Sequence, residues 1–297
     1  DVYKRQESNY TLSGGNHTFN VTARPLTFSS SRNYDGTTTA NTSSLTYTFS
    51  NLVSGESLVL NGSGTVASKD VSGGTQNITL GTITLADNTG VASNYSLTSG
   101  TMNITQKQVN LTGTKVYDNN ATLNNSIISV ASGLVGSETL GLSGDVVTNS
   151  SNVGTYLASA NQLNSGSTSI ALTNGSNGGL SNNYTINEGT YSITQRPVTI
   201  LGTKVYDGAQ TVSSANITTF NNTVGGQTLS ISGNTSFLES QSVGTGKTIN
   251  VTGLALGSGT GTASNYSLSS GTFNVTARPV TLTTSRFFDN TKNVDAT

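Results

Sequence analysis

A block of residues recurs four times along the 297-residue chain, and this repetition limits the folds that the chain can adopt. Each copy carries an Asn-Tyr pair, and the four tyrosines are 85, 89 and 82 residues apart. An aromatic-Asp pair follows each of them, with spacings of 83, 89 and 82 residues. The repeating unit is therefore about the size of one small domain. The landmarks are Asn9-Tyr10, Asn94-Tyr95, Asn183-Tyr184 and Asn265-Tyr266, then Tyr34-Asp35, Tyr117-Asp118, Tyr206-Asp207 and Phe288-Asp289.

The stretch between the two landmarks has the two-residue period of half-buried β-strands, with apolar residues alternating with Thr, Ser or Asn. A first strand is expected to bury one pair of side chains per copy: Phe19 and Val21, Met102 and Ile104, Tyr191 and Ile193, or Phe273 and Val275. A second strand carries its own core face: Leu26, Phe28, Arg32 and Tyr34; Val198, Ile200, Gly202, Lys204 and Tyr206; or Val280, Leu282, Arg286 and Phe288. We expect Tyr117 and Tyr206 to be buried and to support their own repeat.

Proline occurs only at the junction between these two strands, at Pro25, Pro197 and Pro279, and Gln108 takes its place in the remaining copy. Because proline ends a strand ladder and stiffens the chain, we place rigid domain boundaries at this junction. The predicted repeats span residues 26–107, 108–196 and 197–278. Residues 1–25 are interpreted as the last strands of a preceding repeat and 279–297 as the first strand of a following one. Residues 1–6 match no repeat position, and we interpret them as non-native sequence.

Gly, Asn, Ser and Thr make up more than half of the chain, a composition that favours short strands and turns over helices. About 85 residues with several short strands predict an all-β fold, a tandem array of small antiparallel β-sandwich domains of the immunoglobulin-like kind. A β-grasp-like unit with one short helix is the alternative, although no helical period supports it.

The charged and reactive residues exclude several functions. A net charge of −1 supplies no basic surface for nucleic acid, and the absence of cysteine removes thiolate metal sites and nucleophiles. No apolar run is long enough to insert into a membrane. His17, the only histidine, aligns with glycine in the other copies and is expected at a turn. We therefore predict no enzyme activity, no catalytic residues, no cofactor and no metal.

Three charged positions recur with spacings of eight and three residues. We expect the stem of the second cation to cover the nearby aromatic ring and its head to pair with a carboxylate. A periodic cationic ligand surface and a calcium site at the aspartate are the alternatives. The three positions hold Arg24, Arg32 and Asp35; Lys107, Lys115 and Asp118; Arg196, Lys204 and Asp207; and Arg278, Arg286 and Asp289.

Several motifs in sequence order resemble the YDG-type and related Gly-rich repeats of bacterial filamentous haemagglutinin-like adhesins. They are GLVGSETL at 133–140, SNVGTY at 151–156, NNYTINEGTYSITQRPVTI at 182–200 and KVYDG at 204–208. The resemblance implies an exported bacterial protein built of tandem β-domains, and it implies no particular ligand. Asn119 and Asn290 replace the glycine of YDG and Phe288 its tyrosine; since asparagine also tolerates left-handed backbone, the turn should survive.

These observations predict a structural stalk segment of a cell-surface or secreted adhesin, with neighbouring repeats as its main partners. The alternative is that the repeats themselves bind a glycan or a host protein. A binding copy should carry exposed aromatic residues or an insertion that its neighbours lack. The loop from Asn161 to Asn183 is the obvious candidate, but it holds no aromatic residue, which favours the stalk. The targeting segment would lie outside this chain.

Overall fold

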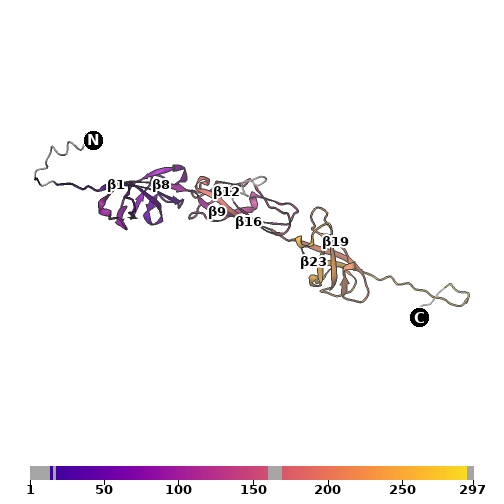
Figure 1. Ribbon diagram of the computed structural model, residues 1–297. Coiled ribbons are helices and arrows are strands. Elements are labelled where there is room, and N and C mark those ends of the chain that lie inside the picture. The colour runs from indigo at the N-terminus through magenta and orange to yellow at the C-terminus, as the bar shows by residue number, and fades with distance from the viewer. Residues whose placement is uncertain (1–13, 16–17, 160–168, 293–297) are drawn as a thin grey trace, which may run out of the picture. The chain divides into compact units, whose positions relative to one another are not determined.

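The computed structural model describes residues 14–15, 18–159 and 169–292, and within them it contains β-strands and short 3-10 turns but no α-helix. The prediction of an all-β fold is thus confirmed. Figure 1 shows the strands along the chain. The 3-10 turns are η2 (Thr42–Ser44), η3 (Val71–Gly73), η4 (Ala92–Asn94), η5 (Asn125–Ile127), η6 (Ser181–Asn183), η7 (Ser214–Asn216), η8 (Val251–Gly253) and η9 (Ala263–Asn265).

The chain divides into two compact units. The first holds the described residues of Asp1–Gln108, Gly133–Leu140 and Asn174–Thr185, and the second those of Val109–Ser132, Gly141–Thr173 and Ile186–Thr297. Each unit therefore combines segments that are distant in sequence. The domain boundaries proposed from the proline junctions stay a prediction.

In the first unit, a four-stranded sheet has the order β3-β1-β8-β6. Its strands are β1 (Arg24–Asn33), β3 (Thr46–Ser50), β6 (Thr75–Ile78) and β8 (Tyr95–Thr105). Two small antiparallel sheets accompany it, one of β2 (Thr39–Asn41) with β5 (Ser63–Thr65), the other of β4 (Leu58–Asn61) with β7 (Thr84–Asp87).

The middle of the sequence forms a second four-stranded sheet with the corresponding order, β11-β9-β16-β14. Its strands are β9 (Lys107–Val116), β11 (Ile128–Ser132), β14 (Gly154–Ser159) and β16 (Tyr184–Thr194). The two small sheets are β10 (Thr122–Asn124) with β13 (Asp145–Val147), and β12 (Leu140–Ser143) with β15 (Ala171–Asn174).

A third sheet, wholly in the second unit, has the order β19-β17-β23-β21. Its strands are β17 (Arg196–Val205), β19 (Ile217–Asn221), β21 (Gly244–Thr248) and β23 (Tyr266–Thr276). A three-stranded sheet beside it contains β18 (Thr211–Ser213), β20 (Leu229–Ser236) and β22 (Leu254–Ser258).

The expectation of antiparallel domains is wrong at the centre of the first and the third of these sheets. β1 pairs with β8 in parallel, and β17 pairs with β23 in parallel. The outer strands β3 and β6 pair antiparallel with their neighbours. Parallel neighbours need a long crossover connection, and the many short strands between β1 and β8 supply it. The sequence period identified the strands but carried no information on their direction.

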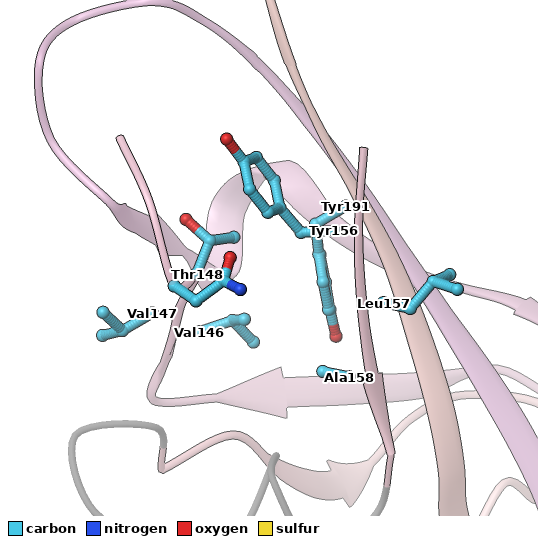
Figure 2. A pocket seen from close by; sticks show the side chains of 8 residues that line it. Val146, Val147, Thr148, Tyr156, Leu157, Ala158 and Tyr191 are labelled. Carbon is cyan, nitrogen blue, oxygen red and sulfur yellow. The ribbon is translucent and has the colours of Figure 1, made fainter. Parts of the chain in front are cut away.

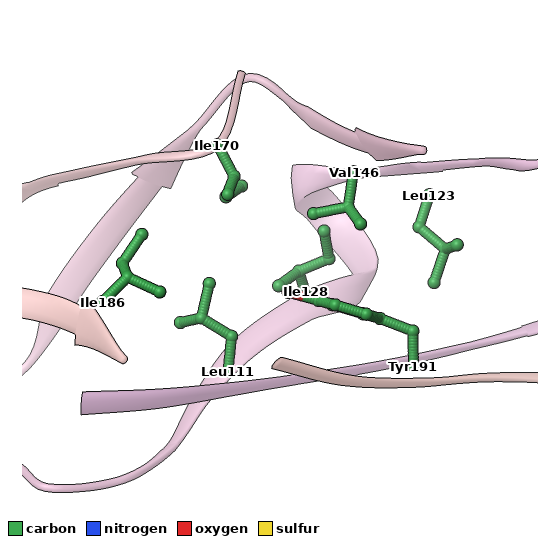
Figure 3. Close-up of a cluster of buried hydrophobic side chains, with 7 residues drawn as sticks. All are labelled: Leu111, Leu123, Ile128, Val146, Ile170, Ile186 and Tyr191. Carbon is green, nitrogen blue, oxygen red and sulfur yellow. The ribbon is translucent and has the colours of Figure 1, made fainter. Parts of the chain in front are cut away.

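The side chains of the predicted core face of β1 are buried. Leu26, Phe28, Arg32 and Tyr34, which alternate along β1 and its end, are all at most 7% exposed. Gly100 on β8 leaves room for the Phe28 ring, since a Cβ atom there would lie 2.2 Å from it. Figure 3 shows an equivalent core in the second unit, made of Leu111, Leu123, Ile128, Val146, Ile170, Ile186 and Tyr191.

Two segments have the same alternation but no strand partner among the described residues. Phe19 and Val21 are 89% and 98% exposed, whereas the aligned Met102 and Ile104 on β8 are 0% and 1% exposed. Val280, Leu282 and Phe288 are likewise exposed. The expected burial of these five side chains is therefore not observed, because burial requires the neighbouring strands as well as the pattern.

Candidate functional site

Two clusters of buried tyrosines connect residues that are more than 100 positions apart. We call them the Tyr34 cluster (Tyr34, Lys69, Glu138 and Tyr184) and the Tyr117 cluster (Tyr117, Asn119, Gln227 and Tyr266). The first lies in the first compact unit and the second in the second unit. In each cluster, the aromatic-Asp tyrosine of one predicted repeat meets the Asn-Tyr tyrosine of the next.

In the Tyr34 cluster the two phenol groups share one carboxylate. The Tyr34 hydroxyl donates to Glu138 Oε1 at 2.6 Å, and the Tyr184 hydroxyl donates to Glu138 Oε2 at 2.6 Å. The rings make an edge-to-face contact with centroids 5.4 Å apart. Tyr34 and Tyr184 are 0% and 2% exposed, so the contact excludes water.

Lys69 balances the charge of this carboxylate. Its Nζ lies 3.6 Å from Glu138 Oε1 and donates to the Tyr34 hydroxyl at 3.0 Å. Burial raises the pKa of Tyr34, and the hydrogen bond to Glu138 raises it further. The same two causes, in the same order, raise the pKa of Tyr184. The hydrogen bond to Tyr34 raises the pKa of Lys69. The cluster thus holds neutral phenols against an ion pair.

The Tyr117 cluster has the same ring geometry without a charge. Tyr117 and Tyr266 have centroids 5.4 Å apart, again edge to face. Tyr266 donates to Gln227 Oε1 at 2.5 Å, while Gln227 Nε2 donates to the Tyr117 hydroxyl at 3.1 Å. The Tyr117 hydroxyl in turn donates a hydrogen bond to Asn119 Oδ1 at 3.2 Å. The Gln227 amide can therefore take the place that the Glu138 carboxylate has in the Tyr34 cluster, because Asn119 Oδ1 supplies the acceptor that the Tyr117 hydroxyl needs.

The asparagine of each Asn-Tyr pair makes a second connection beside each cluster. Asn183 is 0% exposed; its Oδ1 accepts from the Val71 backbone N–H at 3.0 Å and its Nδ2 donates to Asp70 Oδ1 at 2.8 Å. Asn265 repeats this with the Val153 N–H and Asn152 Oδ1, both at 2.8 Å. The asparagine of the recurring Asn-Tyr pair thus contacts residues of the preceding predicted repeat.

The remaining landmark aromatics are placed differently. Tyr206 is 40% exposed, so its predicted burial is wrong, and Phe288 is 89% exposed. Tyr95 is buried and donates to Glu56, whose hydrogen bond raises the pKa of Tyr95. Tyr34 and Tyr117 are buried, but they contact Glu138 and Gln227 instead of acting only within their own repeat. Tyr10 lies outside the described residues.

The second cation pairs with the aspartate in every copy. The pairs are Arg32–Asp35 at 2.5 Å, Lys115–Asp118 at 2.7 Å, Lys204–Asp207 at 2.9 Å and Arg286–Asp289 at 2.8 Å. The side chains of the first three cations are at most 8% exposed, and each also donates to backbone carbonyls of the following turn. Lys204, for example, reaches the carbonyls of Ala209 and Thr211. Its hydrogen bond lowers the pKa of Asp207. These pairs fix the turn after the aromatic residue.

The first cation contacts an asparagine at the end of the neighbouring strand. Arg24 donates to Asn51 Oδ1 at 2.8 Å, and Asn51 Nδ2 donates to the Pro25 carbonyl. Arg196 and Asn222 repeat this contact at 2.6 Å. Both asparagines have positive φ. The Arg-Pro junction at the start of β1 or β17 is therefore tied to the residue that follows the neighbouring strand, β3 or β19. Arg278 is exposed and Lys107 partly so.

A small cavity of about 110 Å³ opens beside β14. Figure 2 shows its lining, which includes Val146, Thr148, Tyr156, Ala158 and Tyr191. The buried Tyr191 hydroxyl has no hydrogen-bond partner within the described part of the chain, and burial raises its pKa to about 12. The aligned residues Met102 and Phe273 have no hydroxyl group.

The other residues and sites considered from the sequence are not part of these clusters. His17 and residues 161–168 of the Asn161–Asn183 loop lie outside the described residues. Across 18–159 and 169–292, no group of three acidic or histidine side chains forms a candidate metal site. Over the same ranges, no helix is long and apolar enough to cross a bilayer. The contact role of Glu138 and Gln227 was not predicted from the sequence. The signal that could have revealed it is that Glu56, Glu138 and Gln227 recur at the same position after a glycine-containing turn.

Comparison with known proteins supplies the family. The model of the YDG domain matches residues 17–103 and 190–273, which together make up more than half of the chain. No curated protein matches the sequence. The first matched segment contains Tyr34 and Tyr95, and the second contains Tyr206 and Tyr266. With the YDG model matched over two segments that carry the same landmarks, this chain belongs to the YDG domain family.

Proposed function

We propose that the chain is a structural stalk segment of a bacterial cell-surface or secreted adhesin of the filamentous haemagglutinin-like kind. In this role it holds a distal binding region away from the cell envelope. The proposal assigns it no catalytic activity and an extracellular location.

The observation that supports the stalk is the burial of Tyr34 and Tyr117 against residues of the next predicted repeat. The Tyr34 hydroxyl bonds a side chain 104 positions later, and the Tyr117 hydroxyl one 110 positions later. Contacts of this kind, together with the short Pro or Gln junctions, would restrict the angle between successive domains. A restricted angle is what a load-carrying spacer needs, whereas domains on free linkers would hold no fixed distance.

The domain architecture forms part of the proposal. We infer three tandem units over 26–107, 108–196 and 197–278. The parallel pairing of the first and last strands in a mixed four-stranded sheet favours the β-grasp-like alternative over an immunoglobulin-like sandwich. Small β-sheets take the place of the short helix that this alternative would include.

Small-angle scattering on the full chain tests the stalk. A compact globule of this length would have a radius of gyration of about 19 Å. A stalk with units of about 30 to 45 Å each should exceed that value clearly, with a maximum dimension on the order of 100 Å. A Tyr34→Ala and Tyr117→Ala double variant should broaden the distance distribution if the clusters restrict bending. A radius near that of a globule would refute the proposal.

A further inference from the structure

One buried position differs in size between the second and the third predicted repeat. It is Thr148, directly after β13, in the second and Phe237, directly after β20, in the third. The two residues correspond because each extends the same strand pairing: the Thr148 N–H donates to the Ala121 carbonyl at 3.0 Å, and the Phe237 N–H donates to the Gln210 carbonyl at 3.1 Å. Both are buried, so a threonine lies inside the second repeat where the third has a phenyl ring.

The cavity beside β14 lies at this position. In the third repeat the Phe237 ring packs edge-on against Phe273, with ring centroids 6.2 Å apart. Tyr191 aligns with Phe273 in the sequence repeat, and both Tyr191 and Thr148 line the cavity. The cavity therefore takes the place of an aromatic ring that the third repeat supplies from its own chain.

The size and the walls of the cavity suit one aromatic ring. Its volume is about 110 Å³. A water molecule needs only about 10–15 Å³, and cavities of about 150 Å³ bind benzene. Figure 2 shows Val146 and Thr148 beside the rings of Tyr156 and Tyr191, and Ala158 adds a further apolar side chain. The walls therefore offer a bound ring both aliphatic and aromatic contacts.

The hydroxyl groups of the lining determine which ring fits. The Thr148 hydroxyl shares its proton between two backbone carbonyls at 2.7 and 2.9 Å, and the Tyr156 hydroxyl donates to the Asn152 carbonyl. The Tyr191 hydroxyl, on a side chain that is 0% exposed, has no partner among the residues that the structure describes. Burial raises the pKa of Tyr191 to about 12, so this hydroxyl stays a neutral donor in need of an acceptor.

We propose that the cavity binds one small uncharged aromatic compound that carries an oxygen, such as a phenol. Its ring takes the place that Phe237 has in the third repeat, and its oxygen accepts from the Tyr191 hydroxyl. The lining residues carry no charge, so an anion would lose its hydration without gaining an ionic partner. This binding site goes beyond the stalk proposal and does not depend on it.

Titration of the full chain with phenol, followed by ligand-observed NMR, tests the site. Phenol should bind, and benzoate, which is charged, should not. Thr148→Phe together with Tyr191→Phe installs the two aromatic residues of the third repeat, fills the cavity and should abolish phenol binding; circular dichroism checks that this variant folds. Tyr191→Phe alone keeps the cavity open. It should weaken phenol binding by about fivefold, the contribution of one hydrogen bond, and leave toluene binding unchanged.

Tyr184→Phe is the matched control, because it removes the hydroxyl of a buried tyrosine that does not line the cavity, and its phenol affinity should equal that of the unaltered chain. Absence of phenol binding by the unaltered chain would overturn the proposal and leave water as the occupant. Undiminished binding in the double variant, or in Tyr191→Phe, would also overturn it. Equal affinity for N-acetyl-tyrosine amide would overturn the assignment to a free compound, because the ring would then come from a protein side chain.

Discussion

The Tyr34 cluster and the Tyr117 cluster place two tyrosine rings at the same distance, 5.4 Å, but link their hydroxyls through different side chains. Glu138 accepts two hydrogen bonds and has Lys69 beside it. Gln227 accepts one hydrogen bond and donates another, and Asn119 completes the chain of hydrogen bonds.

The difference shows that ring packing is the common requirement and that charge is adjusted locally. Where the residue after the aspartate is Gly36, the Tyr34 hydroxyl needs the carboxylate as its acceptor. Where it is Asn119, an amide is sufficient. Gly36 and Asn119 both have positive φ, so either residue allows the same turn. The residue after the aspartate (Gly36 or Asn119) and the residue that bonds the tyrosine hydroxyl (Glu138 or Gln227) must therefore together provide an acceptor for that hydroxyl.

Removing the rings should have the largest effect. Tyr34→Ala and Tyr117→Ala should each lower the free energy of unfolding by about 3 to 5 kcal/mol, as for other large-to-small changes at buried aromatic residues. Tyr206→Ala, at a partly exposed site, should cost less than about 1 kcal/mol. Urea denaturation of the three variants measures this. Equal losses at Tyr34 and Tyr206 would show that the ring acts within its own repeat.

Exchanging the acid and the amide tests whether each cluster needs its own charge. Glu138→Gln leaves the Tyr34 hydroxyl without an acceptor beside Lys69, and Gln227→Glu buries a carboxylate without a cation. Each change should cost about 1 to 3 kcal/mol. Ser151 is the residue that corresponds to Lys69. The residue before each makes the same hydrogen bond: Ser68 Oγ accepts from the Asp70 backbone N–H, and Ser150 Oγ accepts from the Asn152 backbone N–H.

Ser151→Lys should therefore recover part of the loss in Gln227→Glu and should not help the unaltered Gln227 protein. A double-mutant cycle by urea denaturation gives the coupling between the two positions. A coupling energy of zero would mean that the two clusters do not differ in their need for a cation.

Alkaline pH should weaken the Tyr34 cluster. Burial raises the pKa values of Tyr34 and Tyr184 in the folded protein, so their stabilising effect is complete below the unfolded value of about 10. As pH rises above that value, the unfolded chain loses the phenol protons first and stability falls. Urea midpoints between pH 8 and pH 11.5 should show this fall, and Tyr184→Phe should make it shallower. A midpoint independent of pH would contradict the assignment.

The smallest effect is expected at Tyr191, whose buried hydroxyl lacks a described partner. Tyr191→Phe should raise the free energy of unfolding by up to about 1 kcal/mol, because it removes an unsatisfied polar group at no cost in ring packing. The matched control, Tyr184→Phe, removes a hydroxyl that bonds Glu138 and should lower stability instead. Thermal melts of both variants give the two signs directly.

Much of the local structure followed from the residues alone. The alternation of Leu26 and Phe28 predicted a buried strand face, and the recurring cation before the aromatic residue predicted an ion pair with a carboxylate. Both are present, and the carboxylate that pairs with Arg32 is that of Asp35. These features depend on side-chain period and on groups only three residues apart, which a single sequence displays.

The sequence could not decide which strands become neighbours or which tyrosines become buried. Phe19 and Met102 occupy the same position of the repeat, yet one is 89% exposed and the other 0%. Tyr117 and Tyr206 belong to the same motif, but only Tyr117 meets a second tyrosine. Parallel pairing of β1 with β8, and the contact of Tyr34 with Glu138, join residues about 70 and 104 positions apart. Such contacts exist only once the tertiary structure brings the segments together, because burial depends on the surface opposite a residue as well as on the residue itself.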